Sequence, residues 1–108
     1  MYVSITHLRL KSFWKVFQFF KYNGKVQRQI KTANGVLTIE GKGTNFVSFY
    51  TKTSWNTKDD MLVFMRSGAH ANAMKSSSQF AMKVTTTGFE SESVPSWKEA
   101  IELIKAKN

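Results

Sequence analysis

The stretch that decides the fold is NFVSFYTKTSWNTKDDMLVFMRSGAHANAM, residues 45–74. Up to Trp55 the stretch is typical of a strand whose two faces both carry aromatic residues, Phe46 and Tyr50 on one and Phe49 and Trp55 on the other. Thr57 followed by Asp60 has the spacing of a capping box and predicts that a helix begins there. A Ser-Gly break at residues 67–68 then interrupts that helix, and a second helical turn carries His70. The stretch therefore predicts a strand, a helix, a break and a helical turn, in that order.

The neighbouring carboxylates Asp59 and Asp60 invite a metal-binding or acid–base interpretation. Both fall in the first turn of the predicted helix, where negative charge is stabilised by the positive end of the helix dipole. We therefore interpret them as cap residues and assign them no chemistry.

The flanking segments supply the remaining elements. Residues 2–10 alternate in polarity and predict a first strand, after which Ser12 can cap a helix that ends at the Asn34-Gly35 pair. The segment VLTIEGKG, residues 36–43, predicts a second strand, and its end overlaps a predicted turn at residues 41–44 that leads to the third strand. Residues 83–93 predict a fourth strand, and a capping box at residues 96–99 begins a C-terminal helix.

The order strand, helix, strand, strand, helix, strand is that of a ferredoxin-like split βαβ fold in the α+β class. It predicts a four-stranded antiparallel sheet with helices on one face and one extra C-terminal helix. With 108 residues, the chain forms a single domain over residues 1–108. The sheet face without helices needs a cover, and a second copy of the chain is the economical one, so we expect a homodimer.

Composition excludes several classes of site. The chain has no cysteine, which excludes disulfides, thiolate metal sites and cysteine nucleophiles, and only two histidines, His7 and His70. We expect no metal site. The start of the chain lacks the pattern of a signal peptide, and no window approaches the roughly 20 apolar residues of a membrane span. We expect a cytoplasmic protein.

Basic and aromatic residues are concentrated in the first third of the chain. The net charge is +9, and every charged side chain before Glu40 is a cation. Six aromatic residues lie between Phe13 and Tyr22, more than one core-facing side of a helix needs. The surplus can serve a subunit interface, a ligand or a membrane surface, and the charge can attract nucleic acid or anionic lipid. The plainer interpretation is a solvated helix face, and because no nucleic-acid motif is present we expect no such partner.

The segment TSWNTKDDMLVFMRSGAHANAM resembles the W-x-S/T-x-x-D/E-M-x-x-F-x-x-S-x-x-H-x-x-A-M stretch of small dimeric α+β barrel proteins. These include antibiotic-biosynthesis-monooxygenase-like and spheroidene-monooxygenase-like proteins. The opening YVSITHLRLKSFW and the closing VPSWKEAIELI also resemble the ends of such proteins. The matching positions are Trp55, Thr57, Asp60, Met61, Phe64, Ser67, His70, Ala73 and Met74.

The resemblance implies a ferredoxin-like protomer, paired with a second copy into a barrel, with a pocket between sheet and helices. Some such proteins oxygenate aromatic polyketides without a cofactor, and others bind or degrade haem through an Asn, Trp and His constellation. Aligned on Trp55, the Trp and His positions of that constellation fall near Phe64 and Met74, which do not match. We therefore expect no cofactor, with haem left open as an alternative.

Two functions follow from the resemblance. The first is a monooxygenase-like enzyme that acts on a small apolar aromatic or isoprenoid compound, with His70 as proton acceptor or orienting donor. The second is a non-catalytic dimeric ligand-binding or stress-response module that uses the same pocket. Each candidate residue also has a structural interpretation: a helix-end histidine bonded to a carbonyl for His70, a core residue for Trp55 and a solvated side chain for Arg66. The candidate substrate contacts are Phe46, Tyr50, Trp55, Arg66 and Met74.

Overall fold

A computed structural model describes residues 1–107 of the chain. Its four strands form one antiparallel sheet in the order β2-β3-β1-β4. The strands are β1 (Tyr2–Leu10), β2 (Val36–Gly43), β3 (Ser48–Trp55) and β4 (Ala81–Glu90). The helices are η1 (Phe13–Lys15), α1 (Val16–Ile30), α2 (Lys58–Met65), α3 (Gly68–Ser76), η2 (Ser77–Gln79) and α4 (Trp97–Lys107), where η marks a 3-10 turn. The predicted α+β fold is confirmed.

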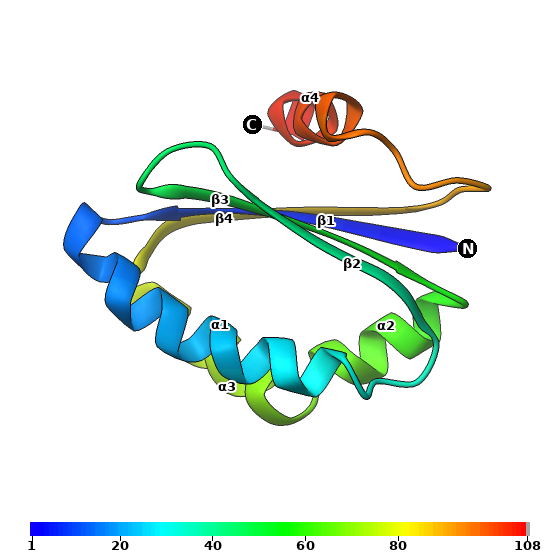
Figure 1. Cartoon of the computed structure of the whole chain (residues 1–108), viewed down its shortest axis with the longest axis horizontal. Helices are drawn as coiled ribbons and strands as arrows, with labels where there is room; N and C mark the ends of the chain where they lie inside the picture. The colour runs from blue at the N-terminus through cyan, green and yellow to red at the C-terminus, as the bar shows by residue number, and fades with distance from the viewer. Residues whose placement is uncertain (108) are drawn as a thin grey trace.

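The sheet has helices on both faces. Figure 1 shows α1, α2 and α3 under one face and α4 alone over the other. Two core clusters, around Trp55 and around Phe80, lie on the three-helix face, and a third joins β1 and β3 to α4 through Val3, Ile5 and Ile104. The extra helix therefore covers apolar residues of the face that we expected a second copy to cover. The homodimer stays a prediction.

A buried lysine fixes the approach of α4 to the sheet. Lys52 is 3% exposed, and its Nζ donates a hydrogen bond of 2.6 Å to the carbonyl of Pro95, just before α4. The same ammonium lies 3.4 Å from a carboxylate oxygen of Glu40 and 4.5 Å from the ring centre of Trp97. These contacts satisfy a charge that would otherwise be costly to bury, and they hold α4 against β3.

Two predicted helix starts are confirmed and one is not. The hydroxyl of Thr57 accepts a hydrogen bond of 3.1 Å from the backbone N–H of Asp60 at the start of α2. At α4, the backbone N–H of Glu99 donates to the hydroxyl of Ser96 (3.2 Å), which in turn donates to the Glu99 carboxylate (3.1 Å). Ser12 makes no cap bond, and a 3-10 turn precedes α1.

Some element boundaries differ from the predictions. β2 continues to Gly43 through part of the predicted turn, because its residues 41–43 pair with β3. β4 ends at Glu90 because the next residues form a turn, in which the Ser91 hydroxyl bonds the carbonyl of Ser93. Helix α1 begins at Val16 and ends at Ile30, before the predicted end at Asn34-Gly35, and the helical turn at His70 is the nine-residue helix α3. Within residues 1–107, no helix combines the length and apolarity that crossing a bilayer requires.

Candidate functional site

A cavity of about 430 Å³ lies between the sheet and helices α1, α2 and α3. This volume falls in the range of sites that enclose small organic molecules. The cluster around Trp55 and Phe64 closes one end, and the cluster around Phe19 and Phe80 lines the other. The sequence resemblance implied a pocket between sheet and helices, and the cavity lies there.

The floor of the cavity is a patch of hydroxyl groups on the sheet. Strand pairing places Ser4 opposite Thr53, and Thr6 between Thr51 on β3 and Thr86 on β4. All five side chains line the cavity because residues two apart on a strand share a face. The hydroxyl of Thr6 donates to that of Thr86 at 3.4 Å. The floor therefore offers hydrogen-bonding groups to a ligand.

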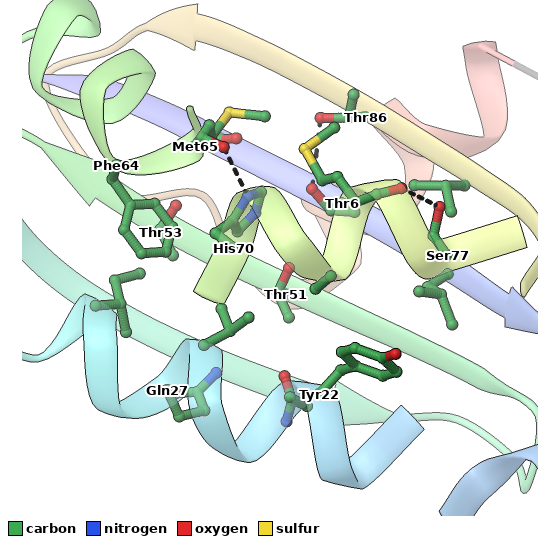
Figure 2. A pocket seen from close by; sticks show the side chains of 18 of the residues that line it. Thr6, Tyr22, Gln27, Thr51, Thr53, Phe64, Met65, His70, Ser77 and Thr86 are labelled. Atoms are coloured by element: carbon green, nitrogen blue, oxygen red, sulfur yellow. Dashed lines mark hydrogen bonds between the residues drawn. The ribbon is translucent and has the colours of Figure 1, made fainter. Parts of the chain in front are cut away.

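The walls are mainly apolar and come from the helices and the sheet. Helix α1 contributes several residues, among them Tyr22, Val26 and Gln27, and α3 contributes His70, Ala73 and Met74. Figure 2 shows His70 on α3 facing the space above the sheet, with Tyr22 and Gln27 across from it on α1. Apolar walls around a few polar groups are typical of a site for a mostly apolar ligand.

His70 is positioned by a glutamine from another helix. The side-chain oxygen of Gln29 on α1 accepts a 2.8 Å hydrogen bond from the backbone N–H of His70. The amide nitrogen of Gln29 donates to the carbonyls of Ser67 (2.9 Å) and Phe64 (3.2 Å). One side chain thus holds the end of α2 and the start of α3 together, which fixes where the His70 ring enters the cavity.

The hydrogen bond of the His70 ring determines its tautomer. Nδ1 lies 3.2 Å from the carbonyl oxygen of Met65. A carbonyl only accepts, so Nδ1 carries the proton in this bond and Nε2 of the neutral ring keeps a free lone pair. The ring also packs on Phe64, with ring centres 4.9 Å apart. The predicted carbonyl bond is therefore present, and the cavity-lining position that a catalytic role needs is present with it.

Burial of the ring lowers the pKa of His70 below its ordinary value of 6.5, although the bond to Met65 acts in the opposite direction. The neutral form therefore dominates at pH 7. His70 is thus arranged to accept a proton through Nε2.

The structure brings only part of the predicted site together. His70, Trp55 and Met74 line the cavity. Tyr50 lies on the opposite face of the sheet, where its ring stacks on that of His7 with centres 4.4 Å apart. Phe46 lies in the loop after β2, 75% exposed, and contacts Phe13 instead.

Arg66 follows the last turn of α2, is exposed and does not line the cavity. The residues that sequence reasoning missed are the hydroxyl floor and Gln29. A signal for the floor existed: Thr51 and Thr53 alternate in phase with Trp55, whereas Tyr50 is out of phase with it. No local pattern marks Gln29, because its partners are 35 to 41 residues away in the sequence.

Among residues 1–107, no three side chains of the His, Asp or Glu type lie close enough to hold one metal ion. His7 and His70 lie on opposite sides of the sheet, the first on β1 beside Tyr50 and the second on α3 at the cavity. The cavity offers a half-buried neutral imidazole, hydroxyl groups and apolar walls.

No family model and no curated protein matches the sequence. Solved structures do match the fold. An antibiotic biosynthesis monooxygenase candidate from Nitrosomonas europaea superimposes with a TM-score of 0.73 at 13% identity, covering 86% of this chain and 100% of that chain. A second candidate of the same name, from Deinococcus radiodurans, gives 0.76 at 11% identity, covering 89% and 97%.

A third match is SnoaB from Streptomyces nogalater, a cofactor-independent oxygenase whose structure was solved as a point mutant. It gives a TM-score of 0.70 at 6% identity and covers 86% of this chain and 94% of that chain. At such identities the likeness concerns the fold. The chain thus has the ferredoxin-like α+β fold of the antibiotic biosynthesis monooxygenase proteins, as its sequence resemblance implied.

Proposed function

We propose that this protein binds a small, mostly apolar aromatic or isoprenoid compound in the cavity and acts on it as a monooxygenase-like enzyme. The observation that carries the proposal is the free Nε2 of His70 in a mostly apolar cavity with a hydroxyl floor. The fold shared with a cofactor-independent oxygenase supports the class of reaction.

In the proposed reaction, His70 takes a proton from an activated methylene carbon of the substrate. A neutral imidazole held in an apolar site suits this step, because its Nε2 lone pair is unprotonated at pH 7 and can accept the proton and release it later. The resulting carbanion reacts with dioxygen. One oxygen atom becomes the carbonyl oxygen of the product, and the other leaves as water with the two hydrogens of the original methylene group.

The other lining residues orient the substrate. The flexible side chain of Met74 contacts its apolar part, Thr51 and Thr53 on the floor hydrogen-bond its oxygen substituents, and Trp55, which is 1% exposed, closes the end of the cavity from within the core. We place no role on Tyr50, Phe46 or Arg66, since none of them lines the cavity.

The test uses 1,8-dihydroxyanthrone, a three-ring aromatic compound with an activated methylene group. We expect the protein to bind it and to accelerate dioxygen uptake and formation of the quinone over the rate in buffer. The variant His70→Asn keeps a side-chain N–H near the position of Nδ1 and lacks Nε2, so it should bind the compound without accelerating the reaction. Equal rates for the two proteins would refute the role of His70.

The non-catalytic alternative gives a different result. A binding module would hold the probe, or a compound that co-purifies with it, and consume no dioxygen. An absorbance spectrum of the freshly purified protein tests haem at the same time, because bound haem gives a Soret band. Binding of the probe without dioxygen uptake, or a Soret band, would replace the proposed enzyme with a binding function for the same cavity.

A further inference from the structure

Five large aromatic side chains are exposed at one end of the molecule. Trp14 and Phe46 are 74% and 75% exposed, and Phe17 is 68% exposed. Phe13 contacts both Trp14 and Phe46, with ring centres 5.4 Å apart in each pair. We call Phe13, Trp14, Phe17, Phe20 and Phe46 the aromatic surface. Apolar groups gathered in this way, without a cover, are typical of an interaction site.

Two segments that are distant in the sequence build this surface. Turn η1 and the first turns of α1 carry four of the rings, and the loop between β2 and β3 carries Phe46. Figure 1 shows that loop and the start of α1 at the same end of the sheet. The opposite side of α1 lines the cavity through Phe19 and Tyr22. Helix α1 therefore has a core side and a second apolar side that faces outward.

Basic side chains follow the aromatic ones along the outward side of α1. Lys21 follows Phe17 by one helical turn, Lys25 follows Lys21, and Arg28 follows Lys25, so the four share one stripe of the helix. Lys21, Lys25 and Arg28 are exposed. Residues 1–39 contain no acidic side chain at all. A partner that binds the outward side of α1 should therefore have both apolar and anionic groups.

We propose that the aromatic surface and the basic stripe of α1 bind an anionic lipid bilayer. The aromatic rings would enter the boundary between headgroups and acyl chains, and the cations would lie over the headgroups. A second copy of this chain does not fit the same surface, because it would bring a second set of cations against the first. Three of the seven acidic residues belong to α4 or to the loop before it, and α4 lies over the face of the sheet opposite to α1 (Figure 1): Glu92, Glu99 and Glu102.

The test measures co-flotation of the full chain with phosphatidylcholine vesicles that contain phosphatidylglycerol. We expect the protein to bind these vesicles. Binding should weaken as salt is added, and it should be weak to vesicles of phosphatidylcholine alone. The fluorescence of Trp14 should shift to shorter wavelength on binding, since this ring leaves water while Trp55 is already buried. Removing two rings in Trp14→Ala/Phe17→Ala should weaken binding about tenfold or more.

Charge variants provide a matched control. Lys21→Gln/Lys25→Gln should weaken binding by about fivefold for each charge removed. Lys98→Gln/Lys105→Gln removes the same charge from exposed positions on α4. Its binding should stay within about twofold of that of the unchanged protein, because these charges act on the bilayer only through weak long-range attraction.

Three results would overturn the proposal. The first is a lack of binding to the phosphatidylglycerol vesicles by the unchanged protein. The second is equal binding by the Trp14→Ala/Phe17→Ala variant, whose fold is verified by its unfolding curve. The third is a dimer in solution that this variant converts to a monomer, which would assign the surface to a second copy. None of these results depends on turnover in the cavity.

Discussion

Replacing His70 in two ways separates its structural contribution from its chemical one. His70→Ala removes the hydrogen bond to Met65 and the ring contact with Phe64. His70→Asn keeps a side-chain N–H that can donate to the same carbonyl, but it has no atom at the position of Nε2. The two variants therefore share the loss of the proton acceptor and differ in the hydrogen bond.

The magnitudes follow from these two contacts. A hydrogen bond contributes about 0.5–1.5 kcal/mol to the free energy of unfolding. An aromatic contact such as that with Phe64 contributes about 0.5–1.5 kcal/mol. His70→Ala should therefore lower the free energy of unfolding by about 1–3 kcal/mol, and His70→Asn by the ring contact alone, about 0.5–1.5 kcal/mol. For a domain of this size, each kcal/mol lowers Tm by about 4–8 °C.

The pH dependence of stability provides an independent check on His70. Its pKa is lowered in the folded protein and is about 6.5 in the unfolded chain, so the unfolded chain binds the proton more tightly. Stability is therefore full above pH 6.5 and falls as the pH drops from there through the lowered pKa. The pKa of His7 is also lowered, by burial and then by Arg9 and Lys83. His70→Asn should therefore lose less stability as the pH falls, and the loss that remains should be the part due to His7.

Urea unfolding followed by circular dichroism, at pH values from about 5 to 8, measures both effects. The catalytic consequence is a loss of about a hundredfold or more in rate for both variants, the usual contribution of a positioned general base. If His70→Asn is as unstable as His70→Ala, the hydrogen bond to Met65 does not contribute to the free energy of unfolding. If His70→Asn also keeps full activity, His70 is a structural residue only.

Two pairs of substitutions test the fold by urea unfolding. Gly35→Ala places a side chain at a residue with φ of +80°, so it should cost about 1–2 kcal/mol or more, whereas Gly24→Ala, with open space around it in α1, should stabilise the helix by up to about 1 kcal/mol. Equal changes in the free energy of unfolding for Gly35→Ala and Gly24→Ala would contradict the conclusion that only Gly35 needs a positive φ. Thr53→Val removes the acceptor 3.0 Å from the indole Nε1 of buried Trp55 and should cost about 1–3 kcal/mol, more than Thr51→Val. A Thr53→Val protein no less stable than Thr51→Val would show that the indole finds another partner.

Local patterns predicted the fold well because each signal depends on near neighbours. The cap at Thr57 and the capping box at Ser96 involve residues three apart, and both are present. The alternation of β1 likewise predicted which of its residues share a face, and Val3 and Ile5 lie together under α4. The position of α4 itself was not predicted, because it depends on the distant contact between Lys52 and Pro95.

The site was predicted less completely, and the reason is the geometry of strands. Tyr50 and Trp55 are both aromatic and both on β3, but an odd separation of five residues places them on opposite faces. Composition favoured grouping them, whereas the period of two required Trp55 to share its face with Thr51 and Thr53. Gln29 was missed for another reason: it acts between helices, and nothing in its own segment distinguishes it from a solvated glutamine.

The central claim is that the cavity between α1, α3 and the sheet binds a compact apolar aromatic compound. Calorimetric titration with 1,8-dihydroxyanthraquinone, which lacks a reactive methylene group, measures that binding without turnover. We expect a negative heat-capacity change from burial of apolar surface, and loss of binding in Ala73→Phe, whose new ring occupies the cavity. The control Val63→Phe, at an exposed position on α2, should bind as the unchanged protein does. Undiminished binding by Ala73→Phe, or none by the unchanged protein, would contradict the account.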